Sequence, residues 1–301
     1  MRSTGDGSWR IVVFTDMAGP VLDQLRDLLR EKGHDLVGVF TSPPPRSRPL
    51  VKGHLKVVEA ASELRIPTVM SSKRKDWPAL LRTFEPDLAI SCMFAWKIPK
   101  EVFTLPRLGM FNVHLAQLPQ YRGTNGIGWA FRNDEGELGA AAHWMDEDWD
   151  TGPVIARGLL PYGDDDDFAS LMPGLIQTTF NVIDEALDRV AEGYPGEPQD
   201  EALAQNCPLF EPEWRYIDWN NPARSIHNQV RSWIGGREDQ PRGAYANLNG
   251  ESVLIYKTGL EPAGARSGES PGVVVTQDDG TFLVQCGEGQ LRILEWEQTH
   301  S

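Results

Sequence analysis

Short apolar runs alternate with amphipathic stretches along the first two thirds of the chain. Residues 10–14 (RIVVF) and 36–40 (LVGVF) are typical of buried strands, and the apolar residues from Val21 to Leu29 between them recur at helical spacing. The same alternation predicts further strands and helices at 55–65, 67–70, 77–84, 87–91, 109–114, 126–133, 140–145, 153–160 and 168–192. Buried strands that alternate with helices are typical of a doubly wound, mostly parallel sheet. We therefore predict an α/β, Rossmann-like fold for this part.

The pattern changes after residue 192. Residues 192–212 contain four prolines and few apolar residues, which is typical of a linker. Beyond them, Pro222 precedes an amphipathic stretch that predicts a helix as far as Trp233. Short strands are then predicted at 244–248, 253–258, 272–276, 282–286 and 291–296. Because so many short strands in so few residues favour a small barrel, we predict a Rossmann-like domain at 1–206 and an OB-like β-barrel domain at 207–301.

Composition narrows the classes of partner. The 301 residues include 43 acidic and 29 basic side chains, so the net charge of −14 disfavours a nucleic-acid partner unless a local basic patch overrides it. The widely spaced Cys92, Cys207 and Cys286 show no metal-ligand spacing, and we expect buried thiols and no metal site. The N-terminus lacks an apolar leader, and no apolar run approaches the roughly 20 residues of a membrane span. We predict a cytoplasmic protein with no membrane contact.

Two polar residues, Asn112 and His114, stand at the end of the strand predicted at 109–114. Because strand side chains alternate between faces, residues two apart point to the same side. Asp150 precedes Thr151-Gly152 in a predicted turn that could return its carboxylate to His114. These groups suit acyl transfer to an amine. An amide N–H and an imidazole can stabilise a tetrahedral oxyanion, and an imidazole beside a carboxylate can accept the amine proton.

The motifs around these residues resemble those of the 10-formyltetrahydrofolate-dependent formyltransferases. That family carries Asn-x-His, Leu-Pro-x-Tyr/Trp-Arg-Gly and a later Asp-Thr-Gly. This chain has Asn112-Val113-His114, Leu118-Pro119-Gln120-Tyr121-Arg122-Gly123 and Asp150-Thr151-Gly152. Segments 219–223, 226–228 and 243–245 are similar to the barrel-like domain appended to some family members. The resemblance implies a folate-dependent one-carbon transferase that uses 10-formyltetrahydrofolate as co-substrate.

The resemblance also implies roles for individual residues. Asn112 would hold the formyl oxygen, His114 would act as general base or oxyanion stabiliser, and Asp150 would orient His114. The folate would be bound, largely through backbone, by two segments that comprise Ser91, Cys92, Met93, Phe94, Ala95, Trp96, Asp146, Glu147, Asp148 and Trp149. Candidates for the acceptor side are Tyr121, Arg122, Thr124, Asn125 and His143, with Arg122 also suited to positioning a loop.

Several positions depart from the family pattern. They are Thr15-Asp16-Met17-Ala18 in place of a strand ending in Gly-Thr-Pro, Ala116-Gln117, Thr124-Asn125-Gly126 and Asp148-Trp149. These segments would meet the folate or the acceptor rather than form the catalytic triad. The basic segment 46–52 could meet an anionic ligand or simply be solvated, and the four acids at 164–167 read as a solvated helix start.

Four functions remain open on the sequence. The departures and the negative charge favour formylation of a small-molecule amine, such as an amino sugar, an amino acid or a biosynthetic intermediate. The two-domain layout favours a methionyl-tRNA formyltransferase, and a 10-formyltetrahydrofolate hydrolase would use water in place of the amine. A non-catalytic folate-binding protein is the least supported. Aromatic residues of the second domain could form a homodimer interface, namely Trp214, Tyr216, Trp219 and Trp233.

Overall fold

The computed structural model describes residues 7–17, 20–43, 52–235, 242–262, 269–278 and 281–299. The chain divides into two compact units built from interleaved segments. Unit 1 comprises Met1–Arg122, Gly139–Leu159 and Gly174–Gln205, and unit 2 comprises Gly123–Leu138, Leu160–Pro173 and Asn206–Ser301. The last segment of unit 2 begins beside the predicted boundary, whereas its two shorter segments lie within the predicted first domain. The boundary at 206/207 therefore stays a prediction.

A seven-stranded sheet runs through unit 1, with the strand order β3-β2-β1-β4-β5-β6-β7. Its strands are β1 Arg10–Thr15, β2 Asp35–Thr41, β3 Thr68–Met70, β4 Leu88–Cys92, β5 Met110–His114, β6 Glu137–Trp144 and β7 Val154–Pro161. The first five pair in parallel, and β6 is antiparallel to β5. The order reverses between β1 and β4, because β2 and β3 lie on one side of β1 and β4 lies on the other. This arrangement confirms the predicted doubly wound, mostly parallel sheet.

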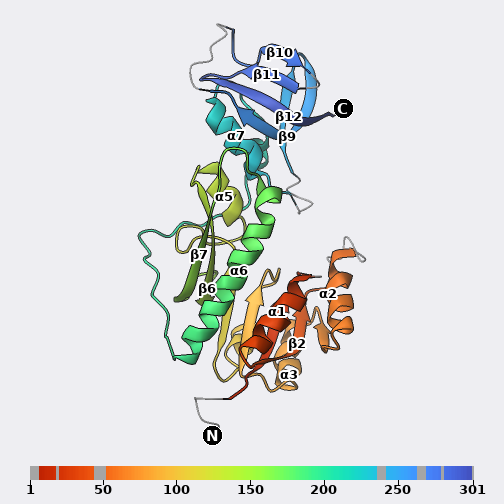
Figure 1. Ribbon diagram of the computed structural model, residues 1–301, viewed down its shortest axis with the longest axis vertical. Coiled ribbons are helices and arrows are strands. Elements are labelled where there is room, and N and C mark those ends of the chain that lie inside the picture. Colours follow the sequence, from red (N-terminus) through yellow and green to blue (C-terminus); the bar gives the residue numbers. More distant parts are fainter. Residues whose placement is uncertain are drawn as a thin grey trace. The chain divides into compact units, whose positions relative to one another are not determined.

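Helices cover both faces of this sheet (Figure 1). On β1, Ile11 and Val13 face a core shared with α1 and α6, whereas Val12 and Phe14 face a core shared with α3 and α4. Alternate strand residues thus enter opposite layers, which explains why the strands read as continuous apolar runs. The helices of unit 1 are α1 Pro20–Glu31, α2 Lys52–Glu63, η1 Arg74–Asp76, α3 Trp77–Arg82, α4 Lys100–Phe103 and most of α6 Phe168–Ala191.

Unit 2 contains a five-stranded antiparallel sheet with the order β10-β11-β12-β9-β8. Its strands are β8 Ala244–Leu248, β9 Glu251–Leu260, β10 Val274–Asp278, β11 Thr281–Gln285 and β12 Gln290–Gln298. Irregular pairing on both sides of Glu295 interrupts the β12 register and lets this strand bend, as a small barrel requires. Helix α7 Ala223–Ser232 packs its Ile226 and Val230 into the core of the sheet. The half-barrel confirms the predicted OB-like fold, and α5 Gly126–Arg132 and η2 Pro212–Arg215 complete the unit.

The acids at 164–167 do precede a helix, as predicted. Asp167 Oδ1 accepts a hydrogen bond from the Ser170 amide at 2.9 Å at the start of α6. Two of the four acids are nevertheless paired within unit 2. Asp164 forms an ion pair with Arg224, and Asp167 lies 3.1 Å from Arg242. The acidic run is therefore partly a set of ion-pair partners rather than a purely solvated helix start.

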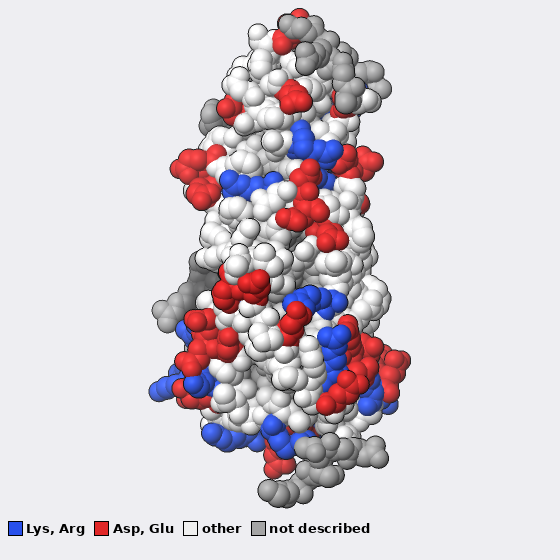
Figure 2. Space-filling model, turned by 90° about the vertical axis from the view of Figure 1, so that its left-hand side faces the viewer, with Lys and Arg blue, Asp and Glu red and all other residues white. Residues whose placement is uncertain are grey.

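Charge is distributed unevenly between the units. Unit 2 contains 20 acidic and 9 basic residues, whereas unit 1 contains 23 acidic and 20 basic residues. On the face drawn in Figure 2, acidic side chains are interspersed with basic ones. Most of the negative charge of the protein therefore belongs to unit 2. Among the helices formed by the described residues, none has the length and apolar character needed to cross a membrane.

Candidate active site

Two neighbouring strands bring the first polar side chains together. Asn112 and His114 alternate with Val113 on β5, so they share one face of the sheet. Strand β6 runs antiparallel to β5 with His143 directly opposite Asn112. The Asn112 Nδ2 atom lies 3.2 Å from His143 Nε2, and His143 is only 3% exposed. The strand register therefore assembles an amide and two imidazoles at one place.

The carboxylate of Asp150 completes this cluster. Asp150 follows β6 in a loop and adopts a left-handed backbone with φ 57°. One carboxylate oxygen lies 3.6 Å from His114 Nδ1, and the other lies 3.4 Å from His143 Nε2 and 3.5 Å from Asn112 Nδ2. The structure thus brings Asn112, His114 and Asp150 together as the sequence predicted, although their catalytic roles stay predictions. It adds His143, which sequence reasoning placed only on the acceptor side.

Backbone carbonyls define which ring nitrogens carry protons. His143 Nδ1 lies 3.0 Å from the Trp144 carbonyl oxygen, and His114 Nε2 lies 2.7 Å from that of Tyr121. Because a carbonyl can only accept, each of these nitrogens donates a hydrogen bond. In the neutral rings, His143 Nε2 can then accept from Asn112, and His114 Nδ1 is left to gain a proton. Asp150 lies beside that nitrogen, so a carboxylate faces the positive charge that would form on His114.

The Asp150 loop is held by close contacts. A Cβ atom added to Gly152 would overlap the Trp144 carbonyl oxygen, so only glycine fits the approach of this loop to β6. The Thr151 hydroxyl donates to the Asp146 carboxylate at 2.7 and 2.8 Å. Gln199 Nε2 donates to the carbonyl oxygens of Asp150 and Gly152, each at 2.8 Å. These bonds fix the backbone that carries the carboxylate.

Gln199 corrects the interpretation of residues 192–212 as a linker. The first part of this segment belongs to unit 1, where Val154 and Glu197 exchange two backbone hydrogen bonds of 2.8 Å. This part of the chain places the Gln199 side chain in contact with the Asp150 loop. Gln199 could not be predicted from the sequence, because its segment has no periodic pattern. Without such a pattern, the local sequence does not indicate which residues the Gln199 side chain contacts. The four prolines marked irregular structure correctly, but irregular structure can still be tightly packed.

The first predicted folate segment, residues 91–96, follows β4. Ser91 and Cys92 are buried at the end of the strand, and Met93 then adopts a left-handed backbone with φ 50°. The rings of Phe94 and Trp96 pack against Trp77, with centroids 5.7 and 6.2 Å apart. These aromatic side chains therefore anchor the segment to the core, whereas the Met93 side chain is 42% exposed.

The second predicted folate segment, residues 146–149, lies beside the first. Lys97 Nζ is 5.7 Å from the centre of the Trp149 ring, and Lys100 forms an ion pair with Glu147. This pairing lowers the pKa of the Glu147 carboxyl, through its hydrogen bond to Lys100 and through the charge of Lys100. Trp149 is 52% exposed, and Asp148 is also exposed. A half-exposed indole is able to stack on a flat aromatic ligand such as a pterin, and the folate role of this segment stays a prediction.

The acceptor-side candidates differ in their surroundings. Tyr121 is buried, and its carbonyl contacts His114. The Arg122 guanidinium donates to Gln199 at 3.0 Å and to both carboxylate oxygens of Glu201 at 2.8 and 2.9 Å, which suits the loop-positioning role considered above. Thr124 is exposed and Asn125 is buried, and both belong to unit 2. Contact of any of these residues with an acceptor stays a prediction.

The cysteines and the possible metal-ligating groups are described separately from this cluster. Cys92, Cys207 and Cys286 are buried, free thiols, as predicted, and burial raises their pKa values to about 12, 11 and 12. Within the described part of the chain, no group of three His, Cys, Asp or Glu side chains is arranged to hold a metal ion. The side chains of the basic segment 46–52 lie outside the described residues.

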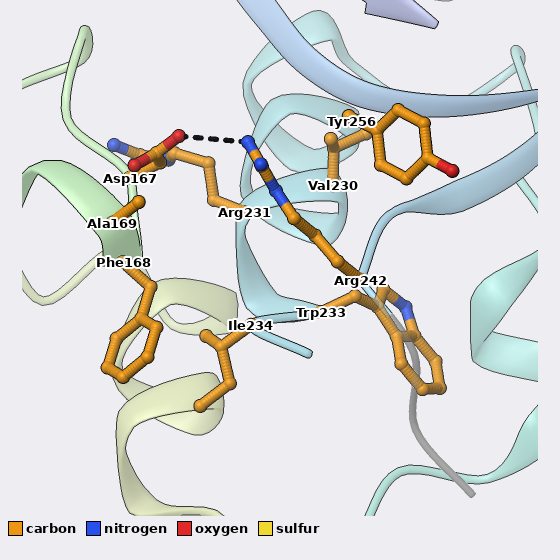
Figure 3. A pocket seen from close by; sticks show the side chains of 9 residues that line it. All are labelled: Asp167, Phe168, Ala169, Val230, Arg231, Trp233, Ile234, Arg242 and Tyr256. Carbon is orange, nitrogen blue, oxygen red and sulfur yellow. Dashed lines mark hydrogen bonds and ion pairs between the residues drawn. The ribbon is translucent and has the colours of Figure 1, made fainter. Parts of the chain in front are cut away.

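A hollow in unit 2 is lined by Asp167, Phe168, Ala169, Val230, Arg231, Trp233, Ile234, Arg242 and Tyr256. In Figure 3, the Arg242 side chain extends across it toward Asp167. Arg242 lies 3.1 Å from Asp167 and 3.8 Å from Glu295, so two carboxylates already balance its charge. The catalytic candidates Asn112, His114, His143 and Asp150 belong to unit 1.

Comparison with known proteins identifies relatives along nearly the whole chain. The family described as formyl transferase matches residues 9–186, and the formyl transferase C-terminal domain matches residues 210–301. The methionyl-tRNA formyltransferase of Geobacter metallireducens is 34% identical over 286 residues, which cover 93% of this chain and 87% of that protein. The methionyl-tRNA formyltransferase of Pelobacter propionicus is 33% identical over 299 residues, which cover 96% and 88%.

Solved structures share the fold at lower identity. HypX from Aquifex aeolicus in complex with tetrahydrofolic acid has a TM-score of 0.66 and 20% identity, and covers 98% of this chain and 45% of its own. An N-formyltransferase from Helicobacter canadensis in complex with folinic acid and dTDP-3-aminofucose has a TM-score of 0.69 and 16% identity, with coverage of 96% and 100%. At these identities the likeness supports the fold alone.

Proposed function

Because the chain belongs to the formyl transferase family and is a folate-dependent enzyme of that family, we propose that it transfers the formyl group of 10-formyltetrahydrofolate to the amine of methionyl-tRNA. The observation that carries the proposal is the cluster of Asn112, His114, His143 and Asp150 in a chain whose two units both match the family. The two relatives described above match nearly the whole chain, and both are named methionyl-tRNA formyltransferase. They favour this acceptor over the small-molecule amine that composition and motif departures suggested.

The residues of the cluster divide the chemistry between them. The folate supplies the formyl carbon. The acceptor nitrogen forms a bond to that carbon, the carbon–nitrogen bond to the folate breaks, and the proton lost by the amine is returned to the leaving nitrogen. Asn112 has two amide N–H groups. One donates to His143 Nε2 at 3.2 Å, and the other, whose contact with Asp150 is long at 3.5 Å, would be given up to the formyl oxygen. His114 Nδ1 receives the amine proton, and Asp150 stabilises the resulting positive charge.

The acceptor is tested by supplying 10-formyltetrahydrofolate and measuring release of tetrahydrofolate in parallel reactions. We expect release with methionyl-tRNA and formylmethionine on the recovered tRNA. Release without any amine would instead show a hydrolase, and release only with an amino sugar or amino acid would show a small-molecule transferase. Folate binding without turnover under every condition would contradict the proposal of an enzyme.

A small-molecule amine is the second candidate, because one structural observation favours it. Unit 2 carries 20 acidic against 9 basic residues, which disfavours contact with a phosphate backbone. A small amine needs no such contact, and it can be tested in the same assay. A cytoplasmic location and a homodimer also stay proposals. Of the four aromatic residues predicted for the dimer interface, only Tyr216 is exposed, at 65%. The prediction is corrected for the others, because Trp219 and Trp233 are buried in the core of unit 2 and Trp214 packs against that core.

A further inference from the structure

Asp16 occupies the point where the strand order of unit 1 reverses. It directly follows β1, whose neighbours β2 and β4 lie on opposite sides. In open α/β sheets, the carboxyl ends of the two strands at such a reversal border the crevice where ligands bind. Asp16 is therefore an acidic side chain at a position that borders such a crevice.

The Asp16 carboxylate joins three separate segments of the chain. Its Oδ1 atom accepts hydrogen bonds from the Thr41 hydroxyl at 3.0 Å and the Ser42 amide at 2.7 Å. Its Oδ2 atom accepts from the Ser42 hydroxyl at 2.7 Å and the Ala95 amide at 2.9 Å. One side chain thus ties the end of β1 to the end of β2 and to the segment that follows β4.

The segment after β4 depends on these contacts for its backbone position. Met93 holds a left-handed backbone that is unfavourable for a residue other than glycine, so neighbouring contacts must maintain it. The Asp16 amide donates to the Met93 carbonyl oxygen at 3.2 Å, and the carboxylate binds the Ala95 amide two residues later. Asp16 therefore forms hydrogen bonds to the segment on both sides of Phe94, whose ring packs into the core.

We propose that Asp16 is a positioning residue that holds residues 91–96 in the conformation that binds the formyl donor. The inference rests on the proposed function, because it assigns those residues to the folate. A carboxylate that accepts four hydrogen bonds fixes the backbone more firmly than neutral groups can, since bonds to an ionised acceptor are the stronger ones. A pre-formed loop loses less conformational freedom on binding, so donor affinity is the property that depends on Asp16.

Three variants test this role, with binding and turnover measured separately. Asp16→Ala removes all four bonds, and Asp16→Asn keeps the shape but leaves one acceptor oxygen. Ser42→Ala is the matched control, because it removes a bond to the same carboxylate without touching the Ala95 amide. The probes are the dissociation constant of 5-formyltetrahydrofolate, a stable relative of the donor, and the KM and kcat values for 10-formyltetrahydrofolate.

We expect Asp16→Ala to raise the dissociation constant and the KM of the donor about 10-fold or more, with kcat within about 3-fold of the wild type. Asp16→Asn should lie between the wild type and Asp16→Ala, and it supplies the test if the alanine variant does not fold. Ser42→Ala should change donor affinity less than about 2-fold.

Wild-type affinity in Asp16→Ala and Asp16→Asn would overturn the inference. Equal weakening in Ser42→Ala and Asp16→Ala would also overturn it, because the effect would then report local stability rather than the Ala95 contact. If the wild type itself failed to bind 5-formyltetrahydrofolate, the proposed function would fail, and that result is distinct from either outcome for the variants.

Discussion

At the scale of single residues, Asp150 holds the site together because its carboxylate faces two imidazoles and an amide. The bond from Asn112 to His143 keeps the amide beside it, and the carbonyl of Tyr121 turns the His114 ring so that Nδ1 faces the carboxylate. Each partner therefore limits how the next can rotate. Such mutual restraint suits a site that must stabilise charge as it develops.

His114→Ala removes the nitrogen that would take the amine proton. We expect kcat to fall by about 10³-fold or more, while 5-formyltetrahydrofolate binds within about 3-fold of the wild-type affinity. Parallel measurements of turnover and equilibrium binding separate the two effects. Full activity in this variant would refute the mechanism.

Gly152→Ala tests the close approach of the Asp150 loop to β6. The added methyl group would overlap the Trp144 carbonyl oxygen, so the loop must shift and carry Asp150 away from His114. We expect kcat to fall at least about 10-fold and the melting temperature to drop by several degrees, roughly the cost of overpacking a tight site. Gly136→Ala is the control, because an added Cβ there meets nothing within 4 Å, although its positive φ carries some strain. A wild-type kcat for Gly152→Ala would contradict this explanation.

At the scale of elements, an irregular segment supports the Asp150 loop through side-chain hydrogen bonds. Gln199 bonds two carbonyls of the Asp150 loop and also accepts from Arg122. Gln199→Leu keeps the approximate volume but loses all of these bonds. We expect kcat to fall about 5- to 20-fold, since each lost bond is worth about 1 kcal/mol and the loop would be less well placed. Glu201→Gln on the same segment should stay within about 2-fold in kcat, and a comparable loss there would show that the segment acts as a whole.

Helix α7 carries a buried histidine that should make unit 2 sensitive to acid. His227 Nε2 lies 3.0 Å from the Asp164 carbonyl and Nδ1 lies 2.8 Å from the Thr258 hydroxyl. Burial lowers the pKa of His227 to about 4, so between about pH 6.5 and 4 the unfolded chain binds the proton more tightly. The stabilisation is complete above about pH 6.5 and is lost as the pH falls toward 4, by about 3 kcal/mol in all.

Urea unfolding at pH 7.5 and pH 5, followed by tryptophan fluorescence, measures this dependence. His227→Gln cannot be protonated but can still donate to Asp164 and accept from Thr258. We expect the variant to lose less stability than the wild type between the two pH values. Identical pH dependence in both proteins would show that other groups are responsible.

Most elements could be predicted because their apolar residues follow a clear period. Strand β1 and helix α1 are examples, and β8 has the predicted bounds. Helix α4 was not predicted, because its four residues are too few to show a helical period. The triad could be proposed from Asn112, His114 and Asp150, but the pairing of His143 with Asn112 depends on the register between β5 and β6. The Asp16 contacts join segments about 25 and 79 residues away in the chain, which no local pattern reveals.

At the scale of the whole molecule, the negative charge of unit 2 should affect the encounter with tRNA. Glu213 and Glu288 are exposed, and their neutralisation removes repulsion toward phosphates. We expect Glu213→Gln and Glu288→Gln together to lower the KM for methionyl-tRNA about 2-fold at about 50 mM salt, with little effect at about 300 mM because ions screen the charges. An effect that did not change with salt would contradict this electrostatic explanation.

The interleaving of the two units also limits how this protein can have evolved. Asp164 belongs to the Leu160–Pro173 segment, which is separate in sequence from the Asn206–Ser301 segment. Its carboxylate forms an ion pair with Arg224 of that later segment, and its carbonyl accepts a hydrogen bond from His227. A gene exchange with one crossover near codon 206 would transfer the half-barrel strands but leave that partner behind. The two units are therefore expected to be inherited together, with changes accumulating in both rather than by replacement of one.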